Sequence, residues 1–164
     1  MTQTHISKSI LTLAVTVSLF ACGGGPDSSL AGDTSNDPVA KYIGSWKSDC
    51  YSQDGASARA YGDFTKSSAT GFTGSVVAYV YLGTSCSGPS VKSEDVLTNM
   101  TMSLTGAKTI EGQNADTFVG SSDQGSAKIA LATEGTILRV GDNKSDKDAE
   151  GYPTAFYKYI FTRR

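Results

Sequence analysis

The sequence predicts an all-β domain, built as a single antiparallel β-barrel or a β-sandwich. Apolar residues alternate with polar ones in short runs, and no window of a dozen residues carries a stripe of helical period. Turn-forming residues separate these runs at intervals of roughly ten residues, the spacing of barrels and sandwiches. The 164 residues include 18 Gly and 8 Tyr, which also favours strands and turns. This length suits one domain.

The expected strands begin near Val39 and follow a period of two. They cover residues 42–51, 72–82, 96–104, 128–133, 136–140 and 154–162. Glu134-Gly135 is expected to form a two-residue hairpin turn between two of them. The polar stretch 142–151 is expected to be a solvated hairpin loop before the last strand.

Residues 1–21 have the layout of a bacterial export signal. Lys8 provides a positive start, and an apolar run of about 11 residues follows, short of the roughly 20 that span a bilayer. The run ends in Leu19-Phe20-Ala21-Cys22, which resembles the lipobox of bacterial lipoproteins. That resemblance implies cleavage before Cys22 and attachment of a diacylglycerol and acyl chains such as palmitate to Cys22. An ordinary secretory signal with an incidental Cys, or a transmembrane anchor, is the alternative.

The lipoprotein resemblance also implies a place in the cell envelope. Two or more acyl chains hold a protein stably on a membrane. In this family an Asp after the acylated Cys often retains the protein in the inner membrane, so Gly23 favours the outer membrane, facing the periplasm or the cell surface. Residues 22–38, rich in Gly, Ser, Asp and Asn, are expected to form a flexible tether, and residues 39–164 the β domain.

Composition argues against several kinds of chemistry. A formal net charge of -2 argues against a nucleic-acid partner. The single histidine, His5, lies in the predicted signal, so the mature chain would lack the imidazole of a Ser-His-Asp triad or of a His-ligated metal or haem site. No pattern places two carboxylates across a cleft. We therefore expect a protein that is not an enzyme and that needs no cofactor.

Cys50 and Cys86 are the only thiols that remain once Cys22 is acylated. Export to an oxidising compartment predicts a disulfide between them, with free or redox-active thiols as the alternative. The chain-entropy model gives roughly 3–4 kcal/mol of stabilisation for a loop of this size.

One polar stretch has part of a calcium-binding pattern. Asp146, Asp148 and Glu150 alternate and precede a glycine, which resembles the first half of an EF-hand loop. Tyr157 stands at the twelfth position, where a bidentate Glu is needed, and Pro153 opposes a following helix. A solvated loop is therefore the main expectation and a weak calcium site the alternative.

The two ends of the domain carry a second resemblance. Gly44-Ser45-Trp46 near the first strand and Arg163 near the end of the chain are similar to positions in the lipocalin and fatty-acid-binding group. The resemblance implies that Trp46 closes one end of a barrel and that Arg163 packs over its ring, a cation–π contact of about 0.5–2 kcal/mol. The alternative is that Trp46 is an ordinary core aromatic. A barrel of this kind is filled by side chains or holds one small ligand.

These observations predict a lipid-anchored envelope protein that acts as a non-enzymatic binding module. Its expected partners are the membrane, through the anchor, and a small apolar ligand or an envelope component. The alternative is an accessory or inhibitory domain that makes protein–protein contacts in the envelope. A hollow apolar cavity would favour the first, and a filled interior with an exposed aromatic patch the second.

Overall fold

The computed structural model describes residues 37–93 and 97–164. The predicted signal, Cys22 and all but the last two residues of the predicted tether lie outside these ranges. One short 3-10 turn, η2 (Ala40–Tyr42), precedes the strands. The strands are β1 (Gly44–Ser48), β2 (Tyr51–Gln53), β3 (Ala56–Ser68), β4 (Gly71–Leu82), β5 (Ser90–Lys92), β6 (Leu97–Ile110), β7 (Gln113–Ser122), β8 (Gly125–Glu134), β9 (Ile137–Val140) and β10 (Phe161–Arg163). No helix in the described part of the chain is long and apolar enough to cross a membrane.

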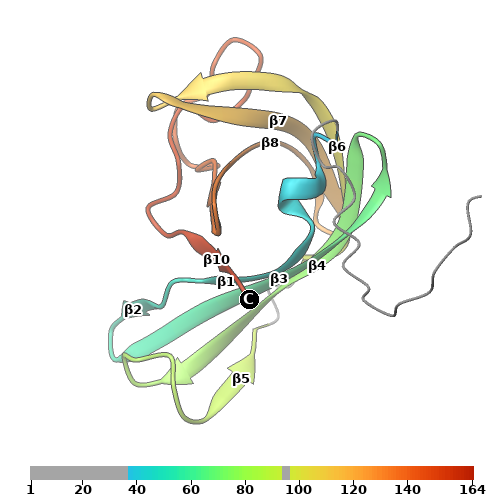
Figure 1. Cartoon of the computed structure of the whole chain (residues 1–164). Helices are drawn as coiled ribbons and strands as arrows, with labels where there is room; N and C mark the ends of the chain where they lie inside the picture. The colour runs from blue at the N-terminus through green and yellow to red at the C-terminus, as the bar shows by residue number, and fades with distance from the viewer. Residues whose placement is uncertain (1–36, 94–96) are drawn as a thin grey trace, which may run out of the picture. The chain divides into compact units, whose positions relative to one another are not determined.

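Eight of the strands close into an antiparallel barrel (Figure 1). Their order around the wall is β3-β1-β10-β9-β8-β7-β6-β4, and β4 pairs back with β3 to complete the circle. Short first and last barrel strands lie side by side, with Trp46 opposite Arg163. The predicted all-β fold is confirmed, and a barrel rather than a sandwich is the form that it takes.

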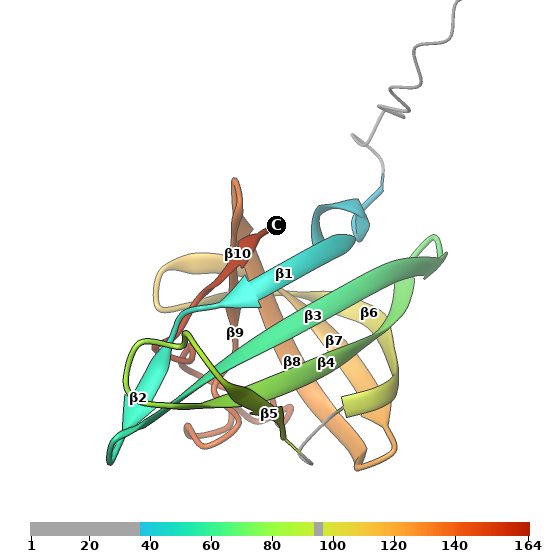
Figure 2. The ribbon, with the colours of Figure 1, turned by 90° about the horizontal axis from the view of Figure 1, so that it is seen from below.

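The hairpin partners β3 and β4 continue beyond the barrel wall (Figure 2). The three-residue strands β2 and β5 pair with their free edges, with Tyr51 opposite Ala58 and Val80 opposite Val91. We call this four-stranded extension, residues 51–58 and 79–92, the ribbon. It projects from the end of the barrel where β6 begins and β7 turns into β8.

The other end of the barrel is closed by its own core. The buried residues of this core are Val39, Tyr42, Trp46, Phe72, Met100, Met102, Phe118, Leu131 and Leu138. Tyr42 is fully buried, and its ring packs on Phe72 and Phe118 at centroid distances of 5.9 and 5.4 Å. The Trp46 indole N–H donates to the Tyr42 carbonyl oxygen over 2.7 Å. The η2 segment therefore plugs this end, called the closed end below.

A second, smaller core lies outside the barrel wall. It consists of Ile110, Ala115, Ala130, Ala132 and Phe156. Because Leu131 points into the barrel, its neighbours in β8 point outwards, which is the alternation that a strand imposes. The loop of residues 141–160 covers this outer surface, and the Lys108–Asp148 ion pair, 2.5 Å long, holds it there.

Several elements differ from the expected ones. Residues 154–160 were expected in a strand, but strand pairing starts only at Phe161, because Phe156 packs on the outer wall instead. The hairpin turn is Gly135-Thr136, one residue later than expected, since Glu134 pairs with Ile137 and Gly135 has a φ of 57°.

The first expected run, 42–51, starts its strand at Gly44, because Tyr42 belongs to η2. Strands β3 and β7 were not expected from the sequence pattern, although each pairs with a strand on either side over much of its length. Asp37, at the end of the predicted tether, contacts the barrel: its carboxylate pairs with Lys66 and accepts the Val39 N–H.

Candidate functional site at the barrel mouth

Trp46 and Arg163 form the seal of the closed end. The Arg163 guanidinium carbon lies 4.4 Å from the centroid of the buried indole. The same guanidinium donates to the carbonyl oxygens of Ile43, over 2.5 Å, and Lys41, over 2.7 Å. One side chain thus joins the last strand, the first strand and the η2 segment, and the contact between the two residues is the one that the lipocalin resemblance implied.

A cavity of about 570 Å³ opens at the other end, called the mouth below. It lies between the start of β6, the β7–β8 hairpin and the beginning of the 141–160 loop. Its apolar base is formed by Met100, Ile129, Val140 and Phe161, and its polar rim includes Gln124, Asp142, Asn143 and Lys144. This volume is within the range of small-molecule sites, roughly 300–1,000 Å³.

Two small residues on the inner wall line this space. Gly120 lies opposite Ala127 in the β7–β8 ladder, and both line the cavity. A Cβ atom at Gly120 would approach Ile129 Cδ1 to 2.6 Å and Met102 Sδ to 2.8 Å, so the core below the cavity packs against bare backbone here. Glycine inside a strand marks such a close approach.

Three tyrosines lie along one side of the mouth. Tyr157 lines the cavity, and its ring is 5.9 Å from that of Tyr159, which meets Tyr51 of β2 edge-on at 5.3 Å. The Lys158 ammonium is 4.8 Å from the Tyr159 ring centroid. A hydrogen bond with the Tyr159 phenol raises the pKa of Lys158. The tyrosine row therefore offers aromatic faces beside a cation.

The ribbon continues the apolar lining away from the mouth. Tyr51, Ala58, Val80 and Val91 are register partners across its four strands, so their side chains share one face. Large parts of this face are open to solvent, with Leu82 81% and Val91 69% exposed. Tyr51 belongs both to this face and to the tyrosine row, so the apolar surface is continuous with the mouth.

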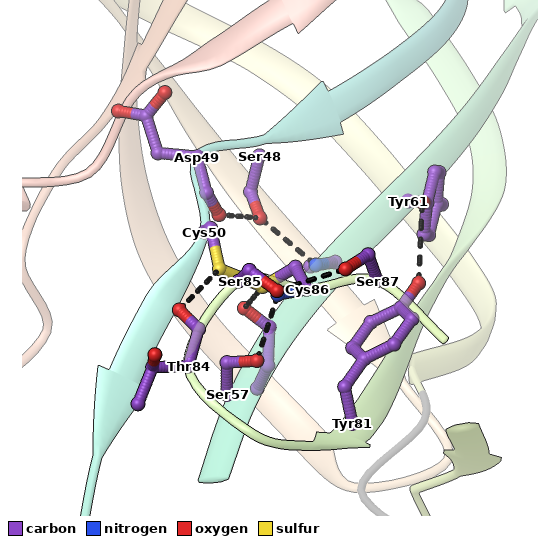
Figure 3. The surroundings of a disulfide bond; sticks show 12 residues. Ser48, Asp49, Cys50, Ser57, Tyr61, Tyr81, Thr84, Ser85, Cys86 and Ser87 are labelled. Carbon is purple, nitrogen blue, oxygen red and sulfur yellow. Dashed lines mark hydrogen bonds between the residues drawn. A yellow bond between two sulfur atoms is a disulfide. The ribbon is translucent and has the colours of Figure 1, made fainter. Parts of the chain in front are cut away.

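The disulfide lies on the opposite face of the ribbon (Figure 3). Cys50 follows β1, Cys86 lies in the β4–β5 loop, and their Cα atoms are 5.8 Å apart. The Cys86 N–H donates to the buried Ser57 hydroxyl oxygen over 2.9 Å. The predicted Cys50–Cys86 bond is confirmed, and it ties the ribbon's outer loop to the barrel strand that carries Trp46.

The candidate calcium residues have other roles. Asp148 and Glu150 both pair with Lys108, at 2.5 and 3.1 Å, while Asp146 accepts the Thr154 N–H and hydroxyl with its backbone carbonyl. The hydrogen bond from Lys108 holds the pKa of Asp148 below its usual value. Among residues 37–93 and 97–164, no group of three or more His, Cys, Asp or Glu is placed to hold a metal ion. The carboxylates of Asp148 and Glu150 anchor the 141–160 loop.

The sequence pattern gave no indication of the mouth. The lining residues come from the β7–β8 hairpin, whose first strand was not expected, and from a loop that was expected only to be solvated. The one local signal was Gly120, a glycine in an otherwise regular strand. Cys22 lies outside the described residues.

The described chain is thus a closed eight-stranded antiparallel barrel with one plugged end and one hollow end, flanked by an apolar ribbon. Comparison with protein-family models, with curated proteins and with solved structures gave no match. Its function is therefore inferred from its own residues.

Proposed function

We propose that this protein is a non-enzymatic binding module that takes a small apolar ligand, or the apolar part of an envelope component, into the mouth of its barrel. The cavity of about 570 Å³ above an apolar base carries the proposal. Burial of apolar surface there stabilises a complex by about 25 cal/mol per Å² removed from water, less the cost of association.

The surroundings of the cavity suit such a ligand. The base offers only carbon and sulfur atoms from Met100, Ile129, Val140 and Phe161, so it selects for apolar surface. The rim is polar and carries the Lys144 side chain, so a ligand with one polar end would leave that end at the opening.

The tyrosine row provides a path from the ribbon into the cavity. Tyrosine rings present an apolar face and a polar tip, which suits a surface that is wet before binding and dry after it. Tyr51 and Tyr157 stay partly exposed at the two ends of the row. The exposed ribbon face beyond them would guide or hold a ligand longer than the cavity.

The proposal includes a lipid anchor at Cys22. The support for it is the lipobox Leu19-Phe20-Ala21-Cys22 and the short apolar run before it. The anchor would place the mouth within reach of envelope lipids and other apolar envelope components, in the outer membrane facing the periplasm or the cell surface.

A second candidate function is a protein–protein contact through the ribbon. The exposure of Leu82 and Val91, two apolar side chains on one face, favours it. An accessory or inhibitory partner would cover this face and leave the cavity empty.

Binding of the uncharged fluorescent probe N-phenyl-1-naphthylamine to the full chain tests the first proposal. Ala127 lines the cavity but is exposed, so Ala127→Trp fills the mouth without entering the core. We expect it to weaken probe binding by about tenfold or more, which corresponds to roughly 1.4 kcal/mol of lost apolar burial. Val119→Trp, on the outer face of the same hairpin, is the matched control and should bind the probe like the native chain.

Two outcomes would overturn a ligand site in the mouth. One is a native chain that does not bind the probe at all. The other is equal binding by the native chain and Ala127→Trp. If probe binding is instead lost in Leu82→Ser and Val91→Ser but kept in Ala127→Trp, the probe binds to the ribbon, and the second candidate function is favoured.

A further inference from the structure

Two arginines flank one tyrosine on the outer wall of the barrel, on the face opposite the mouth's apolar lining. The Arg164 guanidinium carbon lies 5.2 Å from the centroid of the Tyr61 ring. Arg59, two residues before Tyr61 in β3 and therefore on the same face, interacts with the Tyr61 phenol. The phenol oxygens of Tyr61 and Tyr81 are 3.5 Å apart (Figure 3).

Neither guanidinium has a carboxylate partner among the described residues. The ion pairs there involve Lys41, Lys66 and Lys108. Two acidic side chains neighbour this face, and both are engaged otherwise: Asp63 accepts the Ser45 hydroxyl and Asp49 accepts the Ile160 N–H. Both carboxylates stay charged and offset part of the positive charge, but neither pairs with an arginine.

A third cation lies on this face. Lys47 of β1 is the register partner of Tyr61, so its side chain lies on the same outer face. The pKa of Tyr61 responds to these surroundings: a hydrogen bond with Tyr81, and then the charges of Arg59 and Arg164, hold it below its usual value. The charges of both arginines therefore act on the Tyr61 phenol.

One buried donor on this face is unsatisfied. The Nε atom of Arg59 is shielded from solvent and has no hydrogen-bond partner within residues 37–93 and 97–164. A buried donor without a partner costs about 1–3 kcal/mol, and native structures rarely retain one unless a water or an ion completes it. The orphaned atom belongs to one of the two unpaired guanidinium groups, and this coincidence points to a ligand.

We propose that Arg59 and Arg164, with the phenols of Tyr61 and Tyr81, form a site for a phosphate-type oxyanion. A guanidinium matches two oxygens of a phosphate with two parallel N–H donors, and the bonds are strengthened by the charges. The phenols add neutral donors at the rim. The same chemistry is offered by free phosphate and by the phosphodiester headgroup of an anionic lipid, and the site is independent of the apolar mouth.

The test is a thermal melt of the full chain in sodium phosphate against sodium chloride at equal ionic strength. We expect phosphate to raise the midpoint of the native chain, and Arg59→Gln and Arg164→Gln to weaken phosphate binding by about tenfold, the effect of losing one charge-assisted hydrogen bond. Arg139→Gln, the same change on the outer face of β9, is the matched control and should keep the phosphate shift. Arg59→Lys keeps the charge but not the two parallel N–H donors, and should lose most of the affinity for phosphate.

Arg164 is exposed near the chain end, so Arg164→Gln folds even if the Arg59 variants do not. In that case the phosphate-dependent shift of Arg164→Gln tests the site. A phosphate shift shared by all variants, or absent from the native chain, would overturn the site. Melts with short-chain, water-soluble phosphatidylglycerol and phosphatidylcholine distinguish the two sources of the oxyanion. A larger, Arg164-dependent shift with phosphatidylglycerol than with phosphate identifies a lipid headgroup, and a shift with phosphate alone identifies a soluble ligand.

Discussion

Arg163 lies over the indole of Trp46 and is also its register partner across the β1–β10 pair. The contact therefore closes the barrel twice, once through the backbone and once through the side chains. Since β1 and β10 are the first and last strands of the barrel, this single pair joins residues that are more than a hundred positions apart in the chain.

Arg163→Ala should lower the free energy of unfolding by about 2–3 kcal/mol, through loss of a cation–π contact and of hydrogen bonds to two backbone carbonyls. Urea unfolding followed by the fluorescence of Trp46, the single tryptophan, measures it. Arg163→Lys should fall in between, because it keeps the charge but cannot reach both carbonyls. A loss no larger than that of Arg139→Ala would show that the contact does not stabilise the closed end.

Removal of the disulfide should cost more than removal of the Arg163 contact. Cys50→Ser and Cys86→Ser should each lower the free energy of unfolding by about 3–4 kcal/mol, the loop-entropy value for this spacing. The double variant should be no less stable than either single one, because all three lose the same bond. Unfolding of the native chain in reductant should match these variants, and additive losses in the double variant would contradict the shared cause.

Low pH should weaken the Lys108–Asp148 contact that holds the 141–160 loop on the barrel. The Lys108 hydrogen bond lowers the pKa of Asp148 below its ordinary value of 3.8. A lowered folded-state pKa stabilises the native form above pH 3.8, and the contribution is lost as the pH falls through the lowered value. Stability should therefore drop below about pH 4 in the native chain and less steeply in Asp148→Asn. Near-ultraviolet circular dichroism of Tyr152, which packs under Lys108, reports the change, and parallel curves for the two chains would refute it.

High pH should lower the stability of the native chain through Tyr42 at the closed end. Burial, and then the charge of Asp116, raise the pKa of Tyr42 well above its ordinary value of 10.0. Only the unfolded chain can then release this proton near pH 10, so stability is complete below pH 10 and declines above it. Denaturant titrations from pH 9 to about pH 11 should show a smaller decline in Tyr42→Phe, which has no phenol to ionise. An equal decline in both chains would exclude Tyr42 as a cause.

Cys22 is the proposed site of lipid attachment. Cys22→Ala should move the protein from the membrane fraction to the soluble fraction, since the acylated sulfur is the proposed attachment. Mass spectrometry of the native product should show a chain that begins at an acylated Cys22. A variant that stays membrane-bound, or a native chain with an unmodified Cys22, would contradict the lipobox interpretation.

Local pattern was sufficient for the fold class and for one long-range bond. The alternation in 72–82 predicted β4 because Phe72 and Val76 on one face of that strand pack into the barrel. The Cys50–Cys86 bond followed from counting thiols in an exported chain. The alternation can be seen within one segment, and the bond requires only a count of the thiols in the chain.

The unexpected parts depend on partners that no single segment reveals. Strand β3 is rich in Ala and Ser, and its neighbours β1 and β4 rather than its own hydrophobicity hold it in the sheet. Residues 154–160 alternate like a strand, yet Phe156 faces the outer core and Tyr157 the mouth, so the alternation serves two separate surfaces. The cavity is lined by Gly120 and Ala127, which are paired across two strands.

The β3–β4 ladder runs without a break from the Lys66–Phe72 pair to the Ala56–Leu82 pair. At about 3.3 Å per residue this ladder is on the order of 33 Å long, and its end at Ala56 and Leu82 lies in the ribbon. The Cys50–Cys86 bond ties the loop that follows β4 to the segment between β1 and β2, so a covalent link as well as strand pairing holds the ribbon to the barrel.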